Sequence, residues 1–235
     1  MRILVTRPQP GAAQTADALR TRGHAPIVAP LFQIEILSKV DPKAVEWAAI
    51  LLTSANALPA ILKSAGRSAW RGVPVFAVGD RTAQAARECG FTNVISAAGN
   101  VNDLIGVIAA QLKPPARLLY LAGEERTGDL SGALQARNFA VDTFVVYRVL
   151  IAPALPEPAA AALAGDIEGV LHFSRRGADA FLNAARKSRL LAAALSKPIH
   201  FCMSEQVAAR LREAGAMHIQ VAPRPNEDAL LELCG

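Results

Sequence analysis

Two β-rich apolar segments, far apart in the sequence, constrain the fold more than any other feature. They read LFQIEIL at 31–37 and FVVYRVLI at 144–151. Both are rich in β-branched or aromatic residues and are followed by proline-containing turns, as is typical of strands. We interpret them as two parallel strands that cross side by side between two domains, and we expect function in the cleft between those domains.

The rest of the chain alternates short apolar runs with amphipathic segments, which predicts parallel sheets covered by helices. The expected strands are 2–6, 25–29, 48–53, 73–78, 93–96, 117–121, 141–149, 170–173, 199–203 and 218–222. The expected helices are 12–22, 42–47, 57–65, 83–89, 101–112, 130–137, a short alanine-rich one after 158, 178–186, 205–213 and 227–233. The predicted fold class is α/β, with two doubly wound, flavodoxin-like parallel-sheet domains joined by a two-stranded β-ladder.

A permuted internal repeat supports this division. The segment from Phe76 to Asp103 resembles the segment from Phe201 to Asp228, 125 residues later, while 2–36 resembles 117–151, 115 residues later. Chance similarity between alanine- and leucine-rich βα units is the alternative explanation. The permutation predicts a discontinuous domain of residues 1–33 and 152–235, an inserted domain of residues 38–146, and crossing strands at 34–37 and 147–151.

Composition and charge exclude several classes of protein. Apolar residues make up 52% of the 235 positions, which is ample for real cores, and the three cysteines show no metal-binding spacing. We expect free thiols in a reducing cytoplasm, since charge interrupts the first residues too early for a signal peptide and no apolar run is long enough for a membrane helix. The net charge of +5 comes without a basic block, which argues against nucleic acid; it is compatible with an anionic small molecule or with no charged ligand at all. We expect no membrane partner.

Small hydroxyl side chains, glycine and arginine recur where the predicted strands end. In parallel sheets, ligands bind outside these carboxyl ends, where backbone N–H groups at helix N-termini and arginine side chains bind anions. The candidate substrate-binding residues are Thr6, Arg7, Pro8, Thr53, Ser54, Asn56, Gly79, Arg81, Thr82, Arg126, Ser174, Arg175 and Ser204. Taken singly, Ser54, Asn56, Thr82, Ser174 and Ser204 are better explained as N-caps, and each arginine as a solvated surface charge. The case for binding rests on their repetition at equivalent places.

Common catalytic motifs do not occur in the sequence. The GxGxxG, Walker, GxSxG and HExxH patterns are missing, and the four histidines stand apart. We therefore expect no metal site, and chemistry that depends on binding, orientation and electrostatics.

The chain resembles the uroporphyrinogen-III synthase family. The resemblance lies in the order and spacing of VTRP at 5–8, LTSANA at 52–57, VGDRTA at 78–83, VYR at 146–148 and the closing AP at 222–223. It implies a cofactor-free lyase of tetrapyrrole biosynthesis that cyclises hydroxymethylbilane, with loss of water and inversion of ring D through a spiro intermediate. The many carboxylates of that substrate suit arginine-rich strand ends.

The resemblance also implies one catalytic residue. The family's tyrosine maps onto Tyr147, which would hydrogen-bond the departing hydroxyl group; a core tyrosine is the alternative. The sequence departs from the family at Val207, where a threonine is usual, and at 172–176, where HFSRR replaces Phe-Thr-Ser. We hypothesise that Arg175 or Arg176 substitutes for the lost carboxylate contacts.

Other functions stay open at this point. One is a non-enzymatic two-domain protein that closes on an anionic ligand, and another is a nucleotide- or phosphosugar-handling enzyme, against which the missing phosphate-loop motifs argue. For the synthase we also expect a hinge at the crossing strands and a transient encounter with the upstream hydroxymethylbilane synthase, which would hand over the substrate.

Overall fold

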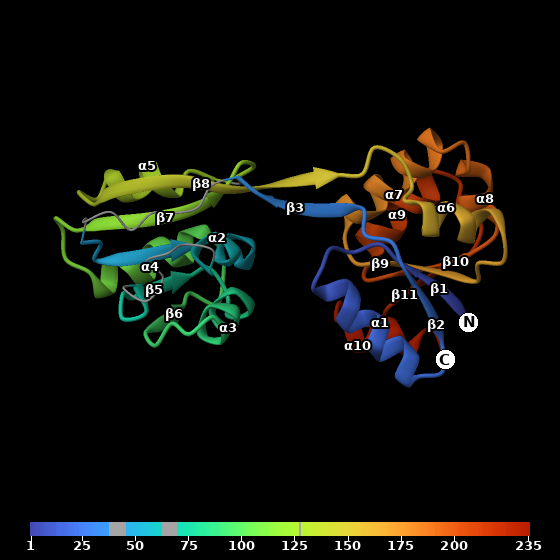
Figure 1. The fold of residues 1–235 in the computed structure, drawn as a ribbon, viewed down its shortest axis with the longest axis horizontal. Coiled ribbons are helices and arrows are strands. Elements are labelled where there is room, and N and C mark those ends of the chain that lie inside the picture. Colours follow the sequence, from blue (N-terminus) through green and yellow to red (C-terminus); the bar gives the residue numbers. More distant parts are fainter. Residues whose placement is uncertain (38–45, 63–69, 127) are drawn as a thin grey trace. The chain divides into compact units, whose positions relative to one another are not determined.

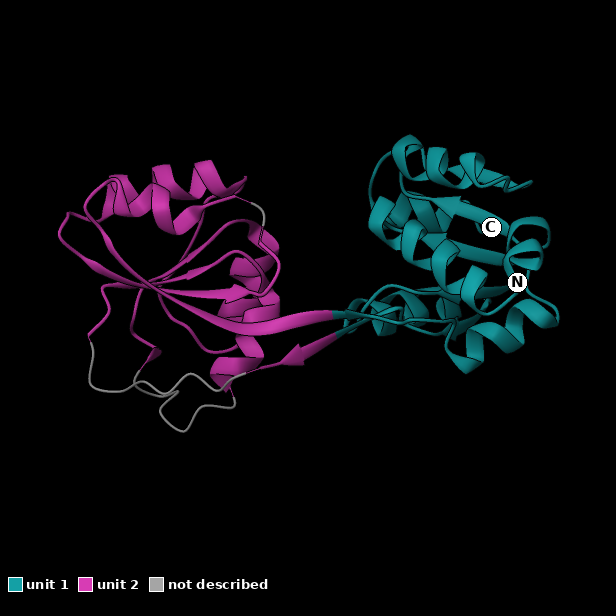
Figure 2. Ribbon diagram, turned by 90° about the horizontal axis from the view of Figure 1, so that it is seen from above, with its two compact units in different colours: residues 1–33, 150–235 teal, residues 34–149 magenta. Residues whose placement is uncertain are grey.

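The computed structural model describes residues 1–37, 46–62, 70–126 and 128–235. The chain forms two compact units, which we call unit 1 (Met1–Gln33 and Leu150–Gly235) and unit 2 (Ile34–Val149) (Figure 2). It passes from unit 1 to unit 2 along β3 (Phe32–Ile36) and returns along β8 (Ala140–Ile151) (Figure 1).

Unit 1 contains a five-stranded sheet in the order β11-β10-β9-β1-β2, in which every pair of neighbours is parallel. Its strands are β1 (Arg2–Val5), β2 (Ala25–Val28), β9 (Gly169–His172), β10 (Ile199–Cys202) and β11 (Ile219–Val221). Helices cover both faces of the sheet. One face is covered by α1 (Gly11–Thr21) and α10 (Glu227–Glu232). The other face is covered by α6 (Glu157–Ala164), α7 (Arg175–Lys187), α8 (Leu191–Ser196) and α9 (Glu205–Glu213). This two-sided burial explains why Ile3, Leu4 and Val5 form a continuous apolar run with no exposed surface.

Unit 2 contains a six-stranded sheet in the order β3-β8-β7-β4-β5-β6. Its other strands are β4 (Ala49–Leu52), β5 (Val75–Ala77), β6 (Val94–Ser96) and β7 (Arg117–Gly123). One face packs against η1 (Ala55–Ala57), α2 (Leu58–Leu62) and α3 (Asp80–Glu88), and the other against α4 (Val101–Gln111) and α5 (Leu130–Gln135). Both units are therefore doubly wound α/β sheets, as the sequence predicted.

The sheet registers confirm the permuted repeat. Arg2 pairs with Ala25 in unit 1, and Arg117 pairs with Ala140 in unit 2, so both partners are shifted by the same 115 residues. His200 pairs with Ile219 and Val75 with Val94, again with one common offset of 125 residues. The order β2-β1-β9-β10-β11 thus corresponds to β8-β7-β4-β5-β6, so both units contain the flavodoxin-like sheet, in unit 2 with a permuted chain order.

The two crossing strands are neighbours, but the expectation that they run parallel is wrong. Leu37 N donates to Val146 O, and Ala152 N donates to Leu31 O, both at 2.9 Å. Residue numbers rise along one strand while those of the paired residues fall along the other, which is the antiparallel pattern. The physical reason is simple: one strand leaves unit 1 and the other returns to it.

Several helix boundaries differ from the expectation. The short helix α8 and the 3₁₀ turn η1 were not foreseen, and α7 begins at Arg175 rather than at 178. Helices this short show too few turns for a periodic apolar face, which is why their patterns are weak. Most of the helix expected at 42–47, and the last part of the one expected at 57–65, lie outside the described residues.

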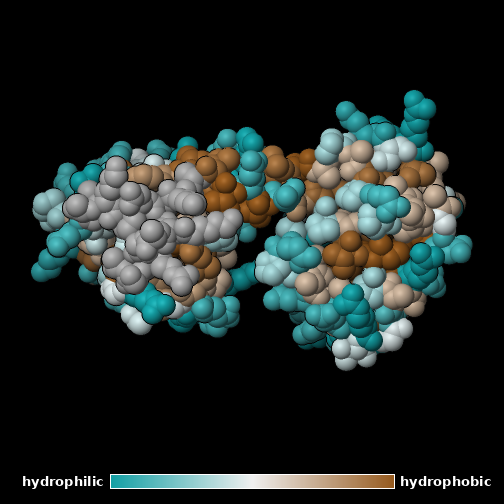
Figure 3. Space-filling view, viewed as in Figure 1, coloured by the Kyte–Doolittle hydropathy of each residue, from teal (hydrophilic) through white to brown (hydrophobic). Residues whose placement is uncertain are grey.

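Exposed apolar side chains gather along β8, which contributes Phe144, Val145, Leu150 and Ile151 at 37–47% exposure. Figure 3 shows hydrophobic surface in this region. No helix in the described part of the chain is long and apolar enough to cross a bilayer.

Candidate functional site

The predicted site residues lie at the carboxyl edge of one sheet or the other, because the central strands of each sheet are parallel. In unit 1, Thr6, Arg7 and Pro8 follow β1, Ser174 and Arg175 follow β9, and Ser204 follows β10. In unit 2, Thr53, Ser54 and Asn56 follow β4, Gly79, Arg81 and Thr82 follow β5, and Arg126 follows β7. The structure therefore groups these residues within each unit, as the strand-end argument predicted.

Two of the predicted hydroxyls cap a helix N-terminus through a side-chain hydrogen bond. Ser54 Oγ accepts from Asn56 N at 3.2 Å, and Ser174 Oγ accepts from Gly177 N at 3.0 Å. Ser204 is the N-cap of α9 but makes no such side-chain bond. The capping interpretation thus holds for Ser54 and Ser174, although each hydroxyl keeps its own proton to donate elsewhere.

Tyr147 lies on β8 with 8% of its surface exposed. The pairing of β7 with β8 is irregular at this point: Ala122 faces Val145, but Gly123 faces Tyr147, so Val146 is an extra residue. Such a β-bulge breaks the alternation of side chains and turns one of them to the other face. As a result, the neighbouring residues Val146 and Tyr147 are both buried.

The phenol of Tyr147 crosses β7 above Gly123. A Cβ atom at Gly123 would lie only 2.7 Å from Tyr147 Cζ and 2.8 Å from its Oη. Beyond β7, at the end of β4, lies Ser54, whose hydroxyl acts on the pKa of the phenol. Burial raises the pKa of Tyr147, Ser54 lowers it in part, and the neighbouring Tyr120 raises it. The phenol therefore stays protonated near neutral pH and is suited to donating a hydrogen bond.

A second tyrosine anchors the end of β4. Tyr120, on β7, is almost fully buried, and its hydroxyl lies 3.1 Å from Thr53 Oγ1. Thr53 immediately precedes Ser54, so this bond holds the strand end that carries Ser54. Tyr120 and Gly123 were not foreseen from the sequence, because only the register of β7 shows what they face.

Arg7 is engaged inside unit 1. Its Nη1 donates to Glu227 at 2.7 Å and to Thr15 at 3.1 Å, and its guanidinium lies 4.1 Å from the ring centre of Phe173. Only 15% of the side chain is exposed. Substrate binding by Arg7 stays a prediction, and this ion pair gives the residue a structural role as well.

We expect Arg7→Ala to lower the free energy of unfolding by about 2 kcal/mol, because it removes a charge-assisted hydrogen bond and leaves Thr15 and Glu227 without this partner. Urea denaturation measures the loss. Arg20→Ala is the matched control, since the Arg20–Asp17 pair is largely exposed and should contribute only about 0.5 kcal/mol or less. Equal losses in the two variants would contradict the structural role.

The other candidate arginines have more exposed side chains than Arg7 or lie beside an aromatic ring. Arg81, Arg126 and Arg175 are exposed, while the guanidinium of Arg176 lies 5.6 Å from the ring centre of Phe32. Val207 is buried in the apolar core of unit 1, which explains how a valine is accommodated at this position.

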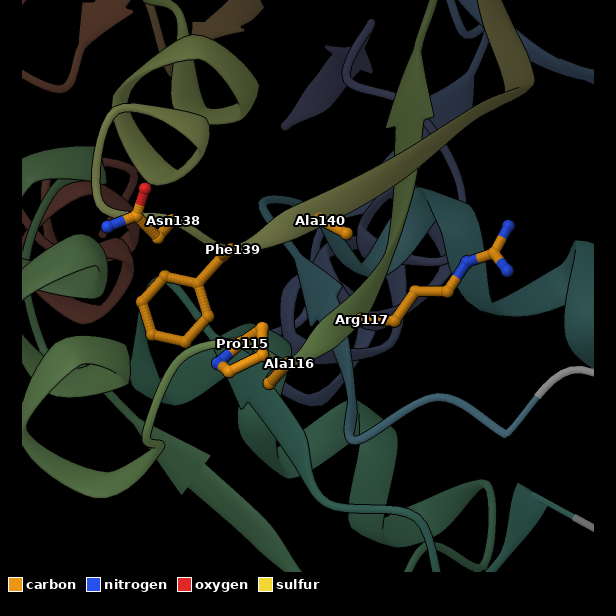
Figure 4. Close-up of a pocket in the computed structure, with 6 residues that line it drawn as sticks. All are labelled: Pro115, Ala116, Arg117, Asn138, Phe139 and Ala140. Carbon is orange, nitrogen blue, oxygen red and sulfur yellow. The ribbon is translucent and has the colours of Figure 1, made fainter.

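A hollow of about 450 Å³ lies elsewhere in unit 2. Its lining comes from the residues at the amino ends of β7 and β8: Pro115, Ala116, Arg117, Asn138, Phe139 and Ala140 (Figure 4). The Arg117 guanidinium is held by Asp142 at 2.6 Å. This hollow is at the opposite end of the strands from the predicted site. No group of three or more His, Cys, Asp or Glu side chains among the described residues could hold a metal ion.

Comparison with known proteins gives one family. The model described as "Uroporphyrinogen-III synthase HemD" matches residues 13–232. The solved uroporphyrinogen-III synthetase of Helicobacter pylori is 19% identical, with a TM-score of 0.62 over 100% of this chain and 98% of that one. A mutant uroporphyrinogen III synthase of Thermus thermophilus is 16% identical, with a TM-score of 0.51 over 100% and 97%. These structural likenesses establish the fold. No curated protein matches the chain.

Proposed function

Because the chain belongs to the uroporphyrinogen-III synthase family, and is thus a cyclising lyase of tetrapyrrole biosynthesis, we propose that its chemistry is centred on Tyr147 at the carboxyl edge of unit 2. The observation that carries the activity is the family match across residues 13–232. What supports the site is a buried, protonated phenol placed beside strand-end hydroxyls.

The first step is loss of the terminal hydroxyl group of hydroxymethylbilane. The Tyr147 O–H hydrogen-bonds that oxygen and transfers its proton to it as the C–O bond breaks, so the electron pair leaves with the oxygen as water. The proton released when the macrocycle closes restores the phenol. Because burial raises the pKa of Tyr147, the phenol acts as a donor and not as a base. The resulting azafulvene cation is attacked by ring D, which inverts through the spiro intermediate before the macrocycle closes.

The carboxylates of the substrate set the second requirement. In unit 2, the exposed guanidiniums of Arg81 and Arg126 and the backbone N–H groups in the first turn of α3 are the proposed carboxylate-binding groups. In unit 1, the corresponding groups are Arg175 and the first turn of α7. Thr6, Ser174 and Ser204 supply hydroxyls along the same edge of unit 1. Holding several carboxylates at once would fold the flexible chain so that ring D meets the cation.

Incubation of the purified protein with freshly generated hydroxymethylbilane tests this function. We expect mostly the type III isomer after oxidation and chromatography, whereas closure without the enzyme gives type I. Heat-denatured protein is the control. If active protein yielded only type I, at the rate of that control, the proposed function would be overturned.

Two further proposals rest on the family. We propose that the protein works in the cytoplasm and that the upstream hydroxymethylbilane synthase hands over its unstable product in a transient encounter. The family match favours an enzyme over a non-enzymatic binding protein.

A further inference from the structure

We propose that Ser54 and Gly123 are positioning residues for Tyr147: Gly123 leaves the room in which the phenol crosses β7, and the Ser54 hydroxyl orients its proton towards the substrate. This inference rests on the proposed function. It adds to it the two contacts that decide where the phenolic proton points.

The first contact is steric. The ring of Tyr147 passes so close to Gly123 that an added Cβ would approach Cζ and Oη within 2.7 and 2.8 Å, well inside van der Waals distance. Gly123 is also the residue at which the pairing of β7 with β8 becomes irregular. A side chain here would therefore push the phenol away from the end of β4.

The second contact is a proposed hydrogen bond from Ser54 to Tyr147, whose hydroxyl passes over Gly123 at the end of β7, the neighbour of β4. Ser54 Oγ already accepts from Asn56 N, so its own proton is available to donate. If that proton is donated to Tyr147 Oη, the phenolic O–H is free to point outward. A hydrogen bond donated to the phenolic oxygen favours the phenolate and so lowers the pKa. Ser54 does lower the pKa of Tyr147, whereas burial raises it.

The permuted repeat provides an internal comparison. The 115-residue offset places Phe32 and Pro8 of unit 1 where unit 2 has Tyr147 and Gly123, and Ser174 ends β9 as Ser54 ends β4. Ser174 keeps its cap on Gly177 N, but Phe32, at the position that corresponds to Tyr147, carries no hydroxyl. The cap therefore recurs in both units, whereas the combination of phenol, glycine and serine belongs to unit 2.

The phenol itself provides a direct readout. The chain has two tyrosines, Tyr120 and Tyr147, so Tyr147 is the sole phenol in a Tyr120→Phe background. In that background, Ser54→Ala should raise the pKa of the phenol in an ultraviolet titration and slow type III formation about 10-fold. Ser54→Thr keeps the hydroxyl and should restore both values. If Ser54→Ala lowered thermal stability but left the phenol pKa unchanged, Ser54 would act only as a helix cap, and its proposed role would be overturned.

Gly123→Ala tests the steric contact. We expect type III formation to fall about 100-fold, as misplacement of a reacting group by about 1 Å can do. In a Tyr147→Phe background the same change should cost little further activity, because both changes disable one group. Gly106→Ala is the control, since an added Cβ meets nothing within 4 Å there. Fully multiplicative losses would overturn the role of Gly123, while a wild-type protein without type III product would overturn the proposed function instead.

Discussion

Tyr147→Phe should slow type III formation about 100-fold, at the lower end of what a general acid contributes. The substitution removes one oxygen atom and keeps the ring that fills the space above Gly123. The loss should appear mainly in kcat, because the hydrogen bond to the departing oxygen strengthens as the C–O bond breaks. Single-turnover assays with isomer separation measure it, and the type I fraction should rise as uncatalysed closure overtakes the enzyme.

Tyr120→Phe is the comparison variant for this experiment. It also removes a buried phenolic hydroxyl, but one whose partner is Thr53. We expect it to cost stability, about 1 kcal/mol, and less than about 5-fold in rate, since this hydroxyl acts only through the strand end. Equal rate losses in the two variants would show that Tyr147 has no special part in the chemistry.

The overall architecture could be predicted because local patterns of apolar residues determine most of its strands and helices. Continuous apolar runs such as 3–5 and 49–52 mark strands that helices cover on both faces. The repeat added the long-range part, since equal offsets in sequence became equal registers in the sheets. The predicted domain crossing already implied that β3 and β8 run antiparallel, since one strand leaves unit 1 and the other returns to it. The sequence-based expectation of parallel strands was therefore wrong.

The site was predicted only in part, because its decisive contacts are not local. Strand ends identify Ser54 and Arg7 as candidates, but nothing in the sequence shows that Arg7 meets Glu227, 220 residues away. Likewise, an irregular register of one residue decides that Tyr147 faces inward. A bulge leaves no clear mark in the pattern of side chains, so Gly123 looked like an ordinary strand-end glycine.

A buried histidine pair should make unit 1 sensitive to mild acid. His172 Nε2 and His200 Nδ1 lie 3.0 Å apart, and both side chains have at most 1% of their surface exposed. Burial lowers the pKa of His200 to about 4, and burial followed by the proximity of His200 lowers the pKa of His172. Both imidazoles are therefore neutral in the folded protein at pH 7.

The sign of the pH effect follows from these lowered values. In the unfolded chain a histidine binds its proton near pH 6.5, whereas folded His200 does so only near pH 4. Between these values the unfolded state holds more protons, so stability is complete above pH 6.5 and falls as the pH drops. His200 alone should cost about 2 kcal/mol by pH 5 and about 3 kcal/mol by pH 4, and His172 acts in the same direction.

The permuted repeat suggests which substitutions remove this sensitivity. Leu52 and Val75 of unit 2 take the places of His172 and His200, so His172→Leu with His200→Val replaces both hydrogen-bonding partners by the apolar residues of the related core. Removing both avoids an orphaned buried nitrogen, and we expect stability at pH 7 within about 2 kcal/mol of the wild type.

Urea denaturation between pH 7 and pH 5, above the range in which ordinary carboxylates titrate, measures the difference. The wild type should lose stability across this window, and the double variant should lose much less. His218→Gln removes an exposed histidine whose charge has only a minor influence on His200, so most of the wild-type slope should remain. If the double variant kept the full slope, the acid sensitivity would arise elsewhere, and the pair would be charged or solvated in the folded protein.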